Sequence, residues 1–198
     1  FVQGGGFMWP ILIALLFGLA VIGERAYSLI NSSSDTDQFF EEVKTIYSDS
    51  GKEQAIEFCE NSPGPVASIF YAGLSKMEKT KEEVEKAVQN AGGLEMAFLE
   101  KNMIWINSVI TIAPMLGFTG TVVGMIKAFE DIKMANDISP AVVAGGISQA
   151  LLTTAFGLIV AMIMQVAQNF FVSMIDKLIL DMEEQSIKIV EYLHSSKK

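Results

Sequence analysis

The feature that most constrains this chain is a run of 24 residues without a formal charge, from Met103 to Ile126. A helix crosses a membrane with about 20 predominantly apolar residues, so this run predicts a transmembrane helix. Small residues let helices approach closely, and hydroxyl groups satisfy polar contacts inside a bundle. The run therefore predicts a membrane helix that faces other protein, because its second half contains Gly117, Thr119, Gly120, Thr121 and Gly124.

Two further apolar runs predict two more membrane spans. The first covers Phe7 to Gly23 and reaches spanning length with its flank up to about Ile30. No basic stretch precedes it, and Glu24-Arg25 follows where a cleavage site would stand, which favours a retained span over a signal peptide. The third is uncharged over 38 residues, 138–175, which is longer than a bilayer requires. The sequence thus predicts an all-α membrane protein with three transmembrane helices.

The polar region between the first two spans has the periodicity of helices. Apolar residues recur at three- and four-residue intervals, and a turn rich in proline and glycine stands at residues 61–65. A segment rich in Glu, Lys, Ala and Leu then leads toward Met103, so we expect one continuous rod from Glu78 into the second span. The expected helices are a pair over 38–59 with a break at 48–51, then 66–77 and 78–99.

These patterns divide the chain into six segments. They are an N-terminal segment with the first transmembrane helix (1–30), a cytoplasmic helical region (31–102), the second transmembrane helix (103–129), a short periplasmic loop (130–139), the third transmembrane helix (140–173) and a cytoplasmic C-terminal helix (174–198). Of the 14 Lys and Arg residues, 11 lie in residues 31–102 and 176–198. The positive-inside rule therefore predicts that these regions form a cytoplasmic helical bundle and that the N-terminus is periplasmic.

Composition disfavours several classes of function. The net charge is −9, and residues 31–102 hold 14 acidic residues against 7 lysines, which disfavours nucleic-acid binding. The single cysteine, Cys59, excludes an intramolecular disulfide, and no pattern indicates a metal or another cofactor. The only histidine, His194, reads as a solvated tail residue. Because no nucleophile or metal-ligand constellation lies near the spans, we expect no enzyme activity.

Two of the spans carry stripes of small and polar residues. Thr121 lies in one such stripe of the second span, and Gln165 and Gln168 lie within about 40° of Thr154 around the third helix. Such stripes can simply hold helices together, which is the favoured reading for any single hydroxyl. Two stripes several turns long also suit a pore or a slot for another polar helix. Neither run contains an ionisable residue, so a titrating group on an ion path would belong to a partner.

Three motifs give the chain a family resemblance. They are Glu24-Arg25 at the end of the first span, Gly120-Thr-Val-Val-Gly-Met-Ile-Lys-Ala-Phe129 in the second, and Gly146-Ile-Ser-Gln-Ala-Leu-Leu-Thr-Thr-Ala-Phe-Gly157 in the third. With these motifs the chain resembles the ExbB/TolQ/MotA family of ion-channel motor subunits, most of all its three-span ExbB/TolQ branch. The flagellar-stator branch, with four spans and a larger cytoplasmic domain, is disfavoured.

The resemblance implies an assembly in the bacterial inner membrane. Members of this family are expected to form a homo-pentamer around a pore. Inside it would lie two copies of an ExbD/TolR-like single-span protein with a membrane aspartate. Ion flow would turn one component against the other, and a TonB/TolA-like protein would receive the motion. Membrane lipid would surround the assembly.

By position in the motifs, Thr121 and Thr154 match the family's two pore threonines. Gln149 stands where ExbB and TolQ relatives commonly have a membrane glutamate, so the resemblance assigns it a neutral place beside the ion path. The remaining candidates are expected to line the pore or to pack the helices: Pro114, Gly117, Gly120, Gly124, Gly146, Thr153, Gly157 and Gln165.

Two hypotheses follow from the sequence. The first is a motor subunit that uses ion motive force, with protons as the favoured ion, for energy-dependent transport or envelope work through a partner. The second is a non-conducting membrane scaffold whose small-residue stripes only assemble partner helices. Both depend on the stripes of the second and third spans, and they differ in whether the Thr121 and Thr154 hydroxyls serve an ion or only hold helices together.

Overall fold

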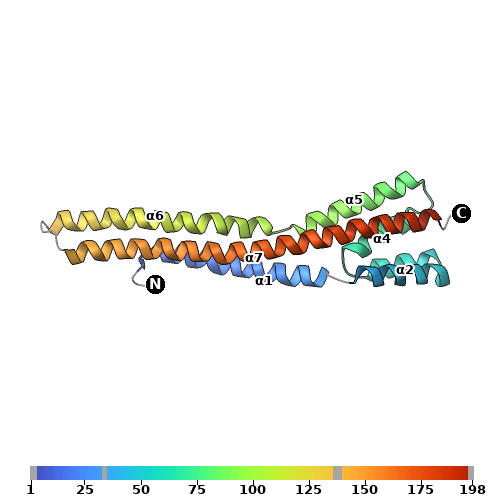
Figure 1. The fold of residues 1–198 in the computed structure, drawn as a ribbon, viewed down its shortest axis with the longest axis horizontal. Helices are drawn as coiled ribbons and strands as arrows, with labels where there is room; N and C mark the ends of the chain where they lie inside the picture. The colour runs from blue at the N-terminus through green and yellow to red at the C-terminus, as the bar shows by residue number, and fades with distance from the viewer. Residues whose placement is uncertain (1–3, 33–34, 136–139, 196–198) are drawn as a thin grey trace. The chain divides into compact units, whose positions relative to one another are not determined.

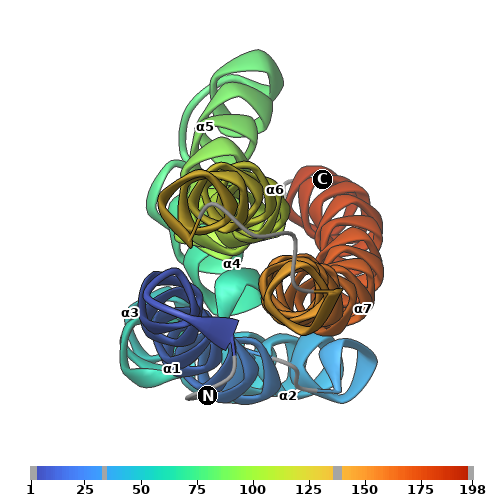
Figure 2. The same cartoon turned by 90° about the vertical axis from the view of Figure 1, so that its left-hand side faces the viewer.

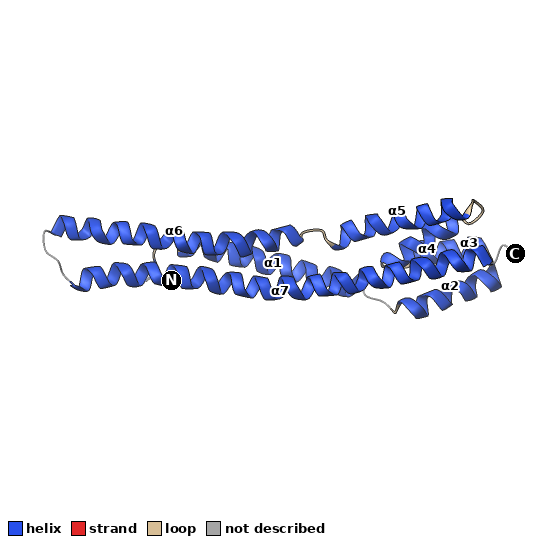
Figure 3. Ribbon diagram, turned by 45° about the horizontal axis from the view of Figure 1, so that its top comes forward, coloured by secondary structure: helices blue, strands red, loops and turns tan. Residues whose placement is uncertain are grey.

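The computed structural model describes residues 4–32, 35–135 and 140–195, and every regular element in these ranges is a helix (Figure 3). The helices are α1 (Met8–Ser32), α2 (Thr36–Ser50), α3 (Lys52–Asn61), α4 (Pro65–Ser75), α5 (Lys81–Leu99), α6 (Met103–Ala135) and α7 (Pro140–Ser195). They belong to two compact units. Residues 1–25 and 102–170 form the first, called the apolar unit, and residues 26–101 and 171–198 form the second, called the polar unit.

Three helical stretches are long and apolar enough to cross a membrane. They are Met8–Ser32, Lys81–Met134 and Val143–Ser195, with mean hydropathies of 1.7, 1.9 and 2.1 over their most apolar windows. The predicted all-α fold with three transmembrane helices is confirmed. α6 continues to Ala135, and the rest of the expected loop, residues 136–139, lies outside the described residues.

The expected rod from Glu78 into the second span is interrupted by a turn. α5 ends at Leu99, and Asn102 has a φ of 67° before α6 begins at Met103. Asparagine is one of the few residues that adopt this left-handed conformation readily. The amide Nδ2 of Asn102 donates a hydrogen bond of 3.2 Å to Oε2 of Glu24. The turn thus links the start of α6 to the charged end of the first apolar run.

In the apolar unit α6 and α7 run antiparallel and α1 contacts both (Figures 1 and 2). Gly120 of α6 lies against Phe7 and Thr153, and Gly18 of α1 lies against Met164 and Val109. The rings of Phe17 and Trp105 meet edge to face, with centroids 6.0 Å apart. The first span therefore packs along the hairpin of the second and third.

Glycines bring α6 and α7 into backbone contact. A Cβ added to Gly157 would lie 2.5 Å from the carbonyl oxygen of Ala113 and 3.3 Å from the Cα of Gly117. A Cβ added to Gly117 would lie 3.0 Å from the Cα of Thr154. Backbone atoms cannot move aside without moving the helix, so these positions accept no side chain at this helix separation. Gly117 and Gly157, two of the residues expected to line the pore or to pack helices, thus lie at this contact between α6 and α7.

The polar unit has a hydrophobic core of its own. The predicted pair of short helices is confirmed as α2 and α3, which are separated at Gly51, where φ is 89°. α4 is the most buried of the short helices, and Phe70 at its centre contacts the rings of Phe39 and Phe40. The C-terminal part of α7 adds Ile189 and Leu193 to the buried residues. The core thus joins the segment between the first two spans to the end of the chain.

A polar contact joins the start of α2 to α7. Oδ1 of Asp37 accepts hydrogen bonds from Nε2 of Gln185 at 2.8 Å and from Nζ of Lys188 at 2.6 Å. The bond from Lys188, followed by that from Gln185, lowers the pKa of Asp37 below its ordinary value. Asp37 in turn raises the pKa of Lys188, with Glu184 adding to the effect. The charged forms of Asp37 and Lys188 therefore stabilise the folded polar unit together.

This contact should make folding of the wild type sensitive to acid. Because the folded pKa of Asp37 is lowered, its contribution is present above the unfolded value of about 3.9 and is lost as the pH falls through the folded value. Asp37→Asn should therefore lower the melting temperature at pH 7, and the difference from the wild type should shrink as the pH falls below about 3.9. Thermal unfolding of the full chain in detergent measures this. The effect should be small and should shrink in high salt, because Asp37 is exposed. A difference that is constant between pH 3 and pH 7 would contradict the assignment.

Gly157→Ala should force α6 and α7 apart. Overpacking of a tight contact typically costs about 1–3 kcal/mol, so the variant should unfold at a lower temperature in detergent. Gly145→Ala is the matched control in the same helix, because a Cβ there meets nothing within 4 Å. That variant should melt at or slightly above the wild-type temperature, since alanine favours a helix over glycine. Equal melting of the two variants would contradict the packing described above.

Candidate functional site

Two threonines from different helices meet in the apolar unit. The Oγ1 atoms of Thr121 on α6 and Thr154 on α7 are in direct hydrogen-bond contact. Oγ1 of Thr154 also donates to the carbonyl oxygen of Gly117 at 2.9 Å. Oγ1 of Thr121 lies 3.2 Å from the same carbonyl oxygen and 3.3 Å from that of Ala150. The structure thus brings together the two residues that the family motifs single out, and we call them the threonine pair.

The threonine pair is half-buried, so part of each side chain remains accessible from outside the subunit. Each hydroxyl has one proton to donate and two lone pairs that accept. One hydroxyl donates its proton to the other, and the second donates to a nearby backbone carbonyl oxygen, so each oxygen keeps at least one lone pair that can accept. Such a pair can accept a hydrogen bond or coordinate a cation. It cannot titrate in the physiological range, so it cannot itself carry a proton.

The remaining predicted residues are divided between several places. Gly120 and Gly157 are buried at helix contacts, and Gly124, Gly146 and Pro114 are partly buried. Thr153 is 1% exposed and donates to the carbonyl oxygen of Gly4 at 2.7 Å, so it serves the contact with the segment before α1. Gln165 is exposed and donates to Asn169 at 2.9 Å. It lies three turns, or about 16 Å along the axis, from Thr154.

Gln149 lies on α7 one turn before Thr153 and is half-buried. One neighbour of its side chain, in the segment before α1, was not expected from the sequence. Gly5, in the segment before α1, is close enough that an added Cβ would overlap the Nε2 of Gln149. The run Gly4-Gly5-Gly6 directly before the first span was the available signal. A run of glycines indicates conformational freedom or a close approach of the backbone, but it does not identify the residue that the backbone approaches.

A second contact that the sequence left open lies at the end of the first apolar run. The side chain of Arg25 is 2% exposed, and its Nε donates to Oε2 of Glu24 at 2.7 Å. Glu24 also accepts the bond from Asn102 described above. A buried charge requires a partner, and Glu24 supplies one. The Glu24-Arg25 motif is therefore a packed ion pair that joins α1 to the turn before α6.

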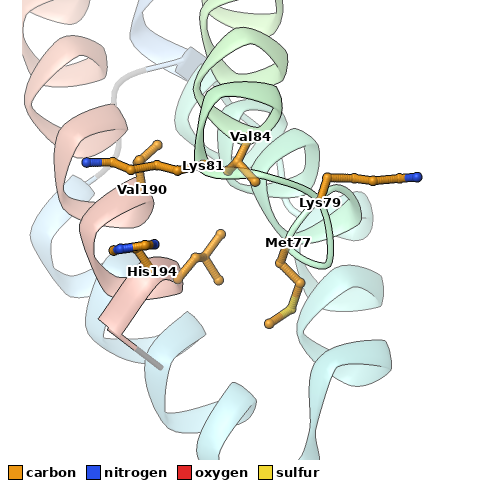
Figure 4. A pocket seen from close by; sticks show the side chains of 7 residues that line it. Met77, Lys79, Lys81, Val84, Val190 and His194 are labelled. Atoms are coloured by element: carbon orange, nitrogen blue, oxygen red, sulfur yellow. The ribbon is translucent and has the colours of Figure 1, made fainter. Parts of the chain in front are cut away.

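One small, partly open hollow of the polar unit holds no comparable site (Figure 4). That hollow lies near the start of α5 and the end of α7, is lined by Met77, Val84 and His194 among others, and holds about 20 Å³, which is room for roughly one water molecule. His194 is exposed, in agreement with its reading as a solvated residue. Within the described ranges, no group of three or more His, Cys, Asp or Glu side chains could hold a metal ion.

Comparison with known proteins gives one family over most of the chain. The MotA/TolQ/ExbB proton channel family matches residues 61–184. The chain is 28% identical to the ExbB-like 3 protein of Synechocystis sp. over 188 residues, which cover 94% of this chain and 90% of that protein. It is 26% identical to the biopolymer transport protein exbB1 of Vibrio cholerae over 80% of this chain and 72% of the relative. It is 29% identical to the Tol-Pal system protein TolQ of Pseudomonas aeruginosa over 56% of this chain and 54% of that protein.

Proposed function

This chain belongs to the MotA/TolQ/ExbB proton channel family, and on that premise we propose that it is the channel-forming subunit of an inner-membrane motor driven by ion motive force. The ion path runs past the threonine pair, with Gln149 as a neutral hydrogen-bonding neighbour. Protons are the ion that the family description favours. The motor drives transport or envelope work of the kind that the names of the ExbB-like and TolQ relatives indicate.

The observation that carries this proposal is the meeting of Thr121 and Thr154. Two hydroxyls from separate helices converge at one level of the apolar unit and remain half-buried. A hydroxyl pair that served only to join helices could be fully enclosed, as Thr153 is at 1% exposure. The threonine pair is instead only half-buried, and its oxygens keep lone pairs, which suits an ion or a partner's polar side chain.

The proposed partner supplies the charge that this chain lacks. Residues 103–126 and 138–175 contain no ionisable side chain, whereas proton relays through membranes depend on such groups. We place a carboxylate from an ExbD/TolR-like single-span protein beside the threonine pair. Five copies of this chain enclose two copies of that partner, and a TonB/TolA-like protein takes up the motion. The polar unit lies in the cytoplasm, because most of the chain's Lys and Arg residues belong to it.

Thr154→Val tests the proposal, because it keeps the shape of the side chain and removes the hydroxyl. Ion flux should fall by about five- to thirtyfold, the size expected for loss of a polar group worth about 1–2 kcal/mol. The measurement is dye-detected proton flux into vesicles that contain the chain together with an ExbD/TolR-like protein of the same organism. Thr119→Val is the matched control, because Thr119 bonds only its own helix, at Met115, and is exposed. Its flux should equal that of the wild type.

Assembly measured on the same samples separates the two hypotheses. If Thr154→Val assembles with the partner normally but conducts poorly, the hydroxyl serves the ion path. If assembly and flux fall together, the threonine pair acts as a scaffold contact only. In that case the partner's membrane aspartate should also be dispensable for the function of the complex. Unchanged flux in Thr154→Val would refute the channel role of this residue.

A further inference from the structure

The segment before α1 makes a specific contact with α7. We call Gly4-Gly5 the N-terminal turn. The carbonyl oxygen of Gly4 accepts a hydrogen bond of 2.7 Å from Oγ1 of Thr153, whose side chain is 1% exposed. Gly4 is itself buried. Phe7 then lies against Gly120 of α6, so the chain enters α1 in contact with both helices of the hairpin.

Gly5 fits its position for two separate reasons. Its φ is +72°, in the left-handed region where a side chain is strained. In addition, a Cβ at Gly5 would overlap Nε2 of Gln149 and would lie 3.0 Å from its Cδ. Gly6 has neither property, because its φ is not in that region and an added Cβ meets nothing within 4 Å. The contact with Gln149 therefore belongs to Gly5 and not to the glycine run as a whole.

This contact places the Gly5 backbone directly against one side of the Gln149 carboxamide. A glutamine side chain loses roughly 1.5–2 kcal/mol of conformational free energy when it is fixed, so it stays mobile unless packing restricts it. Gly5 lies directly against the carboxamide. Thr153, one turn further along α7, anchors the N-terminal turn through the carbonyl of Gly4. The adjacent residue, Thr154, belongs to the threonine pair.

We propose that Gly5 is a positioning residue for the ion path, which holds the Gln149 carboxamide in one orientation on α7 at the turn before the threonine pair. This inference rests on the proposed function. Gly5 acts through Gln149 and does not touch the ion. A side chain at Gly5 would displace the carboxamide, and the ion would then meet a different arrangement of donors and acceptors on its way to Thr154.

The test is a double-mutant cycle in flux per assembled complex, measured in the full chain with its ExbD/TolR-like partner. Gly5→Ala should lower this flux on the order of tenfold, within the range of couplings between residues in contact. Gln149→Asn keeps the carboxamide but shortens the side chain, so the overlap with a new Cβ is relieved. In the Gln149→Asn background, Gly5→Ala should lower the flux by less than about twofold. Gly6→Ala is the matched control and should match the wild type.

The double-mutant cycle separates the effect of the Gly5–Gln149 contact from the effect of backbone strain at Gly5. Strain at a positive φ remains when Gln149 is shortened, whereas the overlap does not. If Gly5→Ala lowers flux equally in both backgrounds, or not at all, the positioning role is overturned. The proposed function is judged separately by Thr154→Val. If Thr154→Val loses flux but the Gly5 and Gln149 substitutions act additively, only this inference is overturned. If Thr154→Val keeps its flux, the proposed function and this inference are both overturned.

A second pair of variants tests the proposal if Gly5→Ala fails to assemble. Thr153→Val removes the hydroxyl that holds the N-terminal turn, and Thr153→Ser keeps it. Flux per assembled complex should fall several-fold in the valine variant, which is about the effect of losing one hydrogen bond. It should stay near the wild-type value in the serine variant. Equal flux in the two variants would overturn the proposal.

Discussion

The close approach of α6 and α7 is the constraint on which the rest of the apolar unit depends. Gly117 and Gly157 leave so little space that backbone atoms of the two helices are in contact. Membrane helices lack a strong hydrophobic force toward one another, so such contacts must come from packing and hydrogen bonds. At this separation Oγ1 of Thr154 reaches the carbonyl oxygen of Gly117 and Thr121 reaches Thr154. A wider separation would leave both hydroxyls bonded only within their own helices.

On the proposed function, the charge on the ion path comes from another chain. The helices that carry the threonine pair contain hydroxyl and amide groups but no ionisable side chain over residues 103–126 and 138–175. Charge in the apolar unit is confined to ends of the spans, as at Arg25, which is buried and paired with Glu24. On the proposed function, hydroxyl and amide groups of this subunit would solvate the ion, and the partner would supply the group that exchanges a proton. Such a separation of roles between two chains is consistent with the proton channel family to which this chain belongs.

The sequence predicted the features that depend on periodicity and composition. Three apolar runs specified three spans, and the break before Gly51 separated α2 from α3, because these signals are local. Features set by tertiary contact were not predicted. Asn102 was the one local signal for an end of α5, and it was insufficient alone, since its left-handed conformation accompanies a bond to Glu24, 78 residues away. The contact of Gly5 with Gln149 likewise joins residues from opposite ends of the apolar unit's sequence.

The threonine pair also shows why a scaffold role and a channel role need not compete. A hydroxyl uses its single proton as a donor and keeps lone pairs for other partners. One hydroxyl of the threonine pair donates to the other, and the second proton goes to a backbone carbonyl oxygen of Gly117 or Ala150, so these bonds join α6 to α7. Each oxygen keeps at least one lone pair. On the proposed function, the bonds that hold the helices together therefore leave acceptor capacity for an ion or for a partner's polar group.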